Sequence, residues 1–235
     1  FYLQQPNFYG QLEDAEALGQ LVHQAGAMYI MGCNPIALAI MKTPRDCGAD
    51  VAVGEGQPLG LPLGYGGPYL GYMATTSKHM RKLPGRIVGQ TVDSKGDPAY
   101  VLSLQAREQH IRREKASSNI CSNEALCAMT ASVYLAAMGP GGLKQVAQAC
   151  AAHAHYLAGE LAKLGFALRS GDKPFFHEVL TDCPVDPAKL CQALEDQGIL
   201  GGLPVDGGIL WCCTELNRKE EIDRLVSVIG EVCKG

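Results

Sequence analysis

A short basic segment carries the side chains best suited to holding an anion. Arg107, Arg112, Arg113 and Lys115 all fall within one stretch of nine residues. Guanidinium groups bind carboxylates and phosphates through paired hydrogen bonds, so this segment could fix such a group on a ligand or partner. The alternative is a solvated face whose cations are balanced by the neighbouring glutamates, which is the usual role of a charge run.

The same segment opens onto polar residues that are typical of a helix start. Ser118 and Asn119 could cap a following helix. His110 could act as an acid or base, although a lone histidine is more often a packing or hydrogen-bonding residue. Cys121, near cations at a helix N-terminus, is the best candidate for a redox-sensitive thiol, with an ordinary buried cysteine as the alternative.

A glycine-rich loop is the second segment that could bind a ligand. Seven glycines lie from Gly54 to Gly71, six of them between predicted strands at 51–53 and 69–75. Glycines let backbone amides approach an anion or a planar ring, but they also serve tight turns, and both interpretations stay open. No nucleotide-binding P-loop pattern is present. Gln57 lies in this loop, and its amide nitrogen is not nucleophilic enough to form an imine with a carbonyl cofactor.

The first half of the chain alternates helical and strand patterns, which favours a parallel α/β sheet. Such sheets bind ligands at the carboxyl ends of their strands, so residues 31–34 and 54–57 are expected to share one crevice. The expected elements are a helix at 11–25, a strand at 27–32, a helical turn at 36–41 and a strand at 51–53.

The second half predicts a hairpin, two alanine-rich helices and a small α+β unit. Turn signals after residue 82 bracket short strands, and Gly139-Pro140-Gly141 separates helices at 123–138 and 142–164. We expect a large domain at 1–150 and a small carboxyl-terminal domain at 151–235. The small domain should contain strands at 166–169, 175–181 and 208–214 and helices at 186–196 and 219–232.

Composition favours a soluble globular protein. Of 235 residues 47% are apolar, which is enough for a sizeable core. The net charge of −4 and the pI near 5.9 argue against non-specific nucleic-acid binding. The sequence indicates no apolar run approaching the roughly 20 residues of a membrane-spanning helix, so no membrane is expected. The first residues look like an interior strand exposed by truncation.

The ten cysteines lack the spacing of a disulfide framework, which predicts free thiols in a reducing cytoplasm. Adjacent Cys212 and Cys213 should point to opposite faces of a strand, and no Cys-x-x-Cys occurs. His153 and His155 should face different directions on a helix. The sequence therefore predicts no metal site.

Several contiguous strings resemble the P-protein family of the glycine cleavage system, glycine decarboxylase, and in particular its amino-terminal-half subunit. The resemblance covers nearly the whole chain and weakens after about residue 165. It rests on Gln-Pro-Asn-Phe-Tyr-Gly at 5–10, the glycine loop at 54–60 and 66–71, Pro-Gly-Arg-Ile-Val-Gly at 84–89, and above all Arg-Glu-Gln-His-Ile-Arg-Arg at 107–113 continuing to Ser-Asn-Ile-Cys at 118–121.

The resemblance implies a type I pyridoxal-phosphate-enzyme fold, like that of aspartate aminotransferase, with a mostly parallel sheet in the large domain and a small α+β domain. In this family the cofactor lysine belongs to the partner subunit. The same frame places Gln57 at the lysine position and Met31 near the position of the acid that holds the ring nitrogen. The resemblance therefore implies no catalytic residue in this chain and pyridoxal phosphate on its partner.

The implied reaction is decarboxylation of glycine with transfer of the aminomethyl group to the lipoyl arm of H-protein. The implied partners are the lysine-bearing subunit 2, in a heterodimer or heterotetramer, and lipoylated H-protein. Candidates for contact with substrate or partner are Arg107, His110, Arg112, Arg113, Ser118 and Asn119.

Two alternatives remain open from the sequence. An independent pyridoxal-phosphate enzyme would need a Schiff-base lysine, and no lysine lies on the predicted strand ends. A non-catalytic interaction module that retains the fold is the other, because fold does not establish function.

Overall fold

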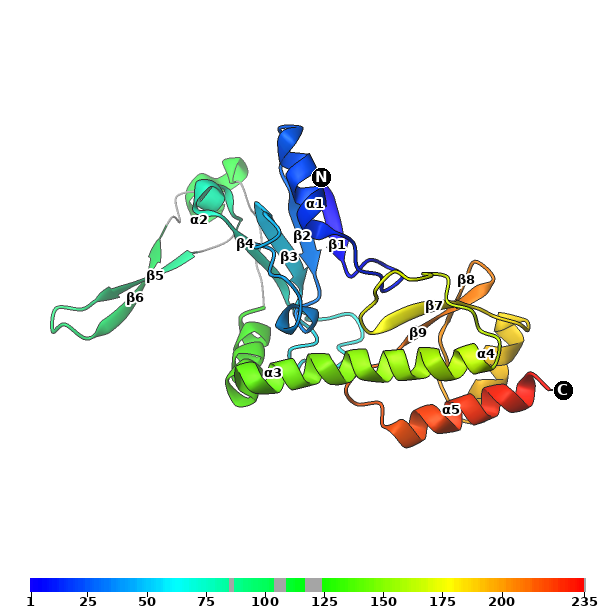
Figure 1. Cartoon of the computed structure of the whole chain (residues 1–235). Helices are drawn as coiled ribbons and strands as arrows, with labels where there is room; N and C mark the ends of the chain where they lie inside the picture. Colours follow the sequence, from blue (N-terminus) through cyan, green and yellow to red (C-terminus); the bar gives the residue numbers. More distant parts are fainter. Residues whose placement is uncertain (85–86, 104–108, 117–123, 235) are drawn as a thin grey trace.

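The computed structural model describes residues 1–84, 87–103, 109–116 and 124–234. Figure 1 shows the elements and the two ends of the chain. The strands are β1 (Tyr2–Gln5), β2 (Ile30–Cys33), β3 (Val51–Glu55), β4 (Gly71–Thr75), β5 (Ile87–Val92), β6 (Pro98–Ser103), β7 (Glu178–Asp182), β8 (Leu203–Val205) and β9 (Gly208–Cys212). The α-helices are α1 (Ala15–Gln24), α2 (Gln109–Arg112), α3 (Glu124–Lys163), α4 (Pro187–Asp196) and α5 (Lys219–Val232).

The first sheet has the order β1-β2-β3-β4. The first three strands are parallel, as the alternating pattern predicts, and β4 returns antiparallel to β3. Helix α1 covers one face, and a cluster including Leu3, Val22, Tyr29 and Met31 fills the space between. The helix begins later than expected because the Asp14 carboxylate caps it by accepting from the amide of Ala17 (3.1 Å).

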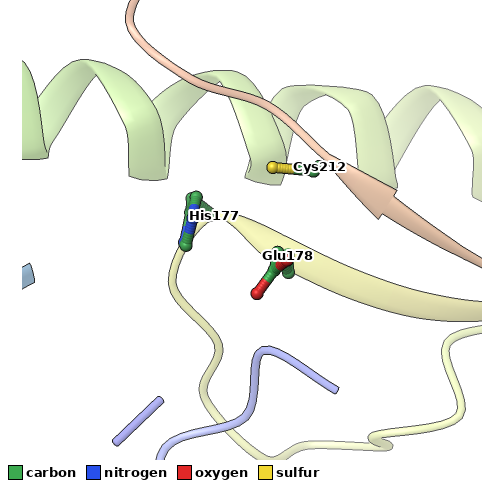
Figure 2. Close-up of side chains that lie close together, drawn as sticks. All are labelled: His177, Glu178 and Cys212. Atoms are coloured by element: carbon green, nitrogen blue, oxygen red, sulfur yellow. The ribbon is translucent and has the colours of Figure 1, made fainter. Parts of the chain in front are cut away.

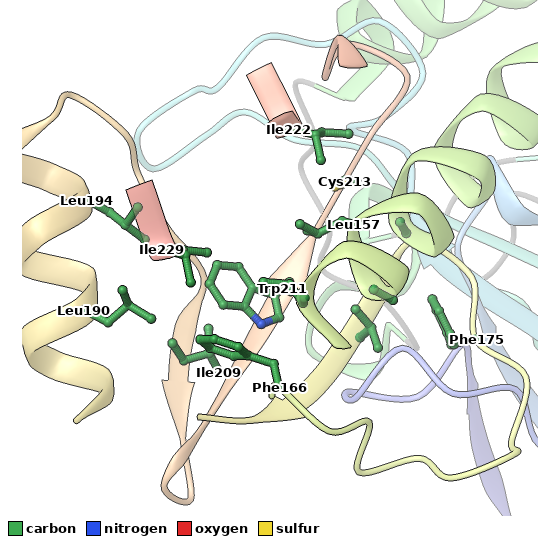
Figure 3. Close-up of a cluster of buried hydrophobic side chains, with 14 residues drawn as sticks. Leu157, Phe166, Phe175, Leu190, Leu194, Ile209, Trp211, Cys213, Ile222 and Ile229 are labelled. Carbon is green, nitrogen blue, oxygen red and sulfur yellow. The ribbon is translucent and has the colours of Figure 1, made fainter. Parts of the chain in front are cut away.

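The second sheet is antiparallel, in the order β7-β9-β8, and packs against α3, α4 and α5. Figure 3 shows its core around Trp211, with Leu190 and Leu194 from α4 and Ile222 and Ile229 from α5. Strands β5 and β6 form the expected hairpin, which projects from the rest of the chain in Figure 1.

Helix α3 runs alongside both sheets and is broken at Gly139 (φ 61°, ψ 178°), where the sequence predicts a separator. Pro140 then begins the second segment, a position that suits its fixed φ and missing N–H. The predicted division between residues 150 and 151 falls inside this second segment and stays a prediction.

Three expectations are corrected. Residues 166–169 form only one bridge, Leu168 with Thr181, rather than a strand, and β8 was not expected. Helix α3, counted across its break at Gly139, is long and apolar enough to cross a membrane by length and composition alone, so the expectation that no apolar run approaches that length was wrong. Only 11% of the 18-residue apolar stretch that meets this criterion is buried within the structure.

Candidate functional site

Two strand ends bring the predicted ligand-binding loops together. Gly32 in β2 is in register with Val53 in β3, so residues 31–34 and 54–57 are neighbours, as expected. The hydroxyl of Tyr72 in β4 crosses the sheet end and donates to the Cys33 carbonyl (2.8 Å). Burial raises the pKa of Tyr72 to about 12, so its hydroxyl stays a donor at neutral pH.

Gly54 makes this bridge possible. A Cβ at Gly54 would lie 2.3 Å from the Tyr72 hydroxyl oxygen and 2.4 Å from the Cys33 carbonyl oxygen. Both distances are too short for any side chain, because the second contact is with backbone. Gly54 therefore serves close packing between strands, which supports the structural interpretation of at least this glycine.

Gln57 is half-buried and uses both its backbone and its side chain to shape the loop. Its amide nitrogen Nε2 donates to the Leu61 carbonyl (2.8 Å), and its backbone N–H donates to Glu55 Oε1 (3.0 Å). The same Glu55 oxygen accepts from the Leu70 amide at the far end of the loop (2.9 Å). Hydrogen bonds of Glu55 and Gln57 thus stabilise the glycine loop, and the side-chain amide of Gln57 is used in a hydrogen bond within this loop.

The loop also packs on the first segment of α3. Leu59 belongs to a buried cluster that includes Ala131. Gly60 (φ +85°) lies against the ring of Tyr134, where a Cβ would come within 2.9 Å of the ring. Glu55 was missed as a loop residue, although an acid at a strand end beside two glycines is a recognisable signal.

Met31 lies in the middle of β2, only 1% exposed, among apolar residues between the sheet and α1. A thioether in such surroundings cannot pair with a protonated ring nitrogen. The resemblance places Met31 near the position of the acid that holds the ring nitrogen, and Gln57 at the position of the cofactor lysine. Both correspondences stay predictions.

The basic segment is only partly described. Arg112 ends α2, and Arg113 follows it with a positive φ of 54°; both side chains are exposed. His110 lies in α2, but its side chain is outside the described residues, as are Arg107, Ser118, Asn119 and Cys121. In Figure 1, α2 lies beyond the outer edge of β4, away from the glycine loop.

The described cysteines are all free thiols, as predicted. Cys212 is exposed and Cys213 is buried, so they do point to opposite faces of β9. His153 Nδ1 lies 2.9 Å from the Thr214 carbonyl oxygen, whereas His155 stacks on Phe175, so the two rings face different surroundings as expected. Register across β7 and β9 also places Cys212 beside His177 and Glu178, a cluster that the sequence analysis did not single out.

The family model of the glycine cleavage system P-protein matches residues 1–229. The chain belongs to this family. A protein named probable glycine dehydrogenase (decarboxylating) subunit 1 from Desulfitobacterium hafniense is 48% identical over 98% of this chain and 53% of its own length. The one from Moorella thermoacetica is 49% identical over 97% of this chain and 53% of its own length. The chain therefore spans about half the length of the curated relatives it matches.

Solved structures agree with this family assignment. A crystal structure of glycine decarboxylase (P-protein) of the glycine cleavage system, in inhibitor-bound form, has a TM-score of 0.92 and 42% identity, covering 98% of this chain and 54% of that one. An alanine–glyoxylate aminotransferase from Nostoc has a TM-score of 0.65 at 18% identity, covering 98% of this chain and 60% of that one. The second likeness shows the fold alone, and it is the aminotransferase-like fold that the resemblance implies.

Proposed function

We propose that this chain is the part of glycine decarboxylase subunit 1 that keeps the cofactor-binding fold without holding the cofactor covalently. The observation that carries this proposal is Gln57. It lies on the loop after β3, it has no amine, and its amide is hydrogen-bonded to Leu61 within the loop. A residue that stabilises its own loop and cannot form an imine has a structural role and does not bind the cofactor covalently.

Pyridoxal phosphate does not fit the described residues at these strand ends. Met31 is buried in an apolar cluster, where it offers no charge to a ring nitrogen. The amine of Lys42 is exposed and forms an ion pair with Glu16. Lys42 is therefore not a desolvated lysine of the kind that forms a Schiff base. We therefore place pyridoxal phosphate on the lysine-bearing subunit 2 and assign this chain no chemical step through it.

The apolar surface of α3 supports an obligate partner. Leu126, Met129 and Val133 in its first segment are 63%, 59% and 64% exposed. Contiguous exposed apolar side chains are typical of protein interfaces rather than of free surfaces. We propose that subunit 2 covers this face, with glycine as substrate and the lipoyl group of H-protein as acceptor, in the cytoplasm.

Arg112 and Arg113 are the described candidates for contact with a carboxylate or with an acidic carrier protein. Exposed guanidinium groups at a partner's surface raise the association rate and fix orientation. Arg107, His110, Ser118 and Asn119 belong to the same proposal through their place in the sequence.

The test is glycine-dependent exchange of carbon dioxide, with lipoylated H-protein, for the whole subunit containing this chain, for subunit 2 and for their mixture. We expect activity only in the mixture, because neither subunit alone completes the site. Activity of this subunit alone would contradict the proposal, and stable association without activity would favour the non-catalytic interaction module.

The same mixture tests the basic segment. Arg113→Glu should weaken subunit association or raise the KM for H-protein by about tenfold, since charge reversal adds repulsion where attraction is proposed. Lys189→Glu, on the exposed face of helix α4, is the matched control and should leave both quantities unchanged. An Arg113→Glu variant that behaves like this control would remove the arginine assignment while leaving the subunit role intact.

A further inference from the structure

Three potential metal ligands converge where β7 begins and β9 ends. Glu178 is the first residue of β7, Cys212 is the last of β9, and the two are direct partners in the antiparallel register. Residues opposite each other project from the same face of a sheet, so a carboxylate and a thiol are neighbours here. His177, just before β7, accepts a hydrogen bond at its carbonyl from the Cys213 amide (2.9 Å), which ties the histidine to the same strand end.

The side chains themselves come together. One ring nitrogen of His177, one carboxylate oxygen of Glu178 and the sulfur of Cys212 all lie within 4.8 Å of one another. Figure 2 shows the three side chains close together, with His177 and Glu178 at the start of β7 and Cys212 on β9. A tetrahedral zinc ion would bring such atoms to roughly 3.5 Å apart, given its bond lengths to nitrogen, oxygen and sulfur. Rotation of the Glu178 and Cys212 side chains can shorten the distances between the three ligand atoms by this small amount.

A second observation concerns the histidine alone. Among the described residues that are not exposed, Nδ1 of His177 is the one fully buried side-chain nitrogen or oxygen without a hydrogen-bond partner. A buried polar atom left without a partner costs about 1–3 kcal/mol, so such atoms are rare and call for an unplaced water or ion.

The carboxylate of the cluster, Glu178, has no compensating cation among the described residues. Within the described part of the chain, the Glu178 carboxylate has no hydrogen bond or ion pair. A divalent cation beside the carboxylate would compensate its charge, and it would bind the Cys212 sulfur as a thiolate after displacing the thiol proton.

We propose that His177, Glu178 and Cys212 form a zinc site. Sulfur and imidazole donors select zinc over magnesium or calcium, and three protein ligands leave one coordination position open. Glu178 and Cys212 also line a pocket of about 630 Å³ together with Leu200, Asn217 and Arg224, so two of the three proposed ligands border a space that a small ligand can enter. This site lies on the second sheet and is independent of the proposed decarboxylase role.

The test uses cobalt as a spectroscopic probe for zinc in the whole subunit. Cobalt bound to a thiolate gives a charge-transfer absorption band, and added zinc should abolish this band at one equivalent per chain. Cys212→Ser should remove the band, and His177→Gln and Glu178→Gln should each lower zinc affinity by about tenfold or more, measured by competition with a chelator.

The matched control is Cys233→Ser, at a half-buried thiol that directly follows α5 and lies outside the cluster. It should keep both the band and the zinc affinity of the parent protein. Circular dichroism of each variant separates loss of a ligand from loss of folding. A band that survives in Cys212→Ser, or the absence of a stoichiometric zinc ion from every variant and from the parent, would overturn the proposal.

Discussion

Trp211→Ala is expected to lower the free energy of unfolding by about 3–5 kcal/mol, the range for truncating a fully buried large aromatic residue. Trp211 is 2% exposed in the core of the small sheet and makes an edge contact with the ring of Phe166. Its indole N–H also donates to the buried hydroxyl of Thr181 (2.9 Å). The substitution therefore leaves a cavity and an unpartnered hydroxyl together. Urea denaturation followed by circular dichroism measures the loss.

Leu200→Ala is the matched control, because Leu200 is apolar, lies in the same sheet region and is 90% exposed. Its unfolding free energy should stay within about 0.5 kcal/mol of the parent. A loss below about 1 kcal/mol for Trp211→Ala would mean that the core in Figure 3 is not the one that stabilises the second sheet.

Gly10→Ala should have an effect of similar size for a different reason. Gly10 has a φ of +77°, and a Cβ there would lie 1.9 Å from the backbone oxygen of Glu178. The Gly10 carbonyl also accepts from the Phe176 amide (3.1 Å), so the segment before α1 is held directly against the start of β7. Because both contacting groups are backbone, relief requires moving the chain, and we expect a loss above about 3 kcal/mol.

Gly26→Ala separates the cost of a positive φ from the cost of a close backbone contact. Gly26 has a similar φ of +70°, but nothing lies within 4 Å of its added Cβ. It should cost only about 1–2 kcal/mol, the cost of a left-handed residue alone. The single tryptophan, Trp211, reports unfolding of both variants by fluorescence. Equal losses for the two variants would show that the close approach of Gly10 to Glu178 is absent in solution.

Local patterns predicted the fold well where one segment specifies its own structure. The parallel strands, the hairpin and the break at Gly139 follow from apolar runs and turn residues near each other in the sequence. Strand β8 was missed because its three residues include Pro204 and carry no alternation. The antiparallel return of β4 depends on pairing with β3, which a strand pattern alone does not specify.

The candidate site was predictable only in part, for the same physical reason. Gln57 was recognised from its place after a strand, yet its bond to Leu61 depends on how the loop closes. The grouping of Glu178 with Cys212 depends on a register between strands separated by a helix, so no spacing in the sequence indicates it. Strand register and loop closure are tertiary properties, whereas the patterns used here are local.

The central claim is that this chain keeps a cofactor-binding fold but cannot hold pyridoxal phosphate as an imine. The most direct test is to incubate the whole subunit with pyridoxal phosphate, remove the unbound cofactor, and record the absorbance at roughly 410–430 nm, where a protonated imine absorbs. Subunit 2 serves as the positive control. We predict no retained band for this subunit and a retained band for subunit 2. A stable band from this subunit alone, fixed by borohydride to one of its lysines, would contradict the account.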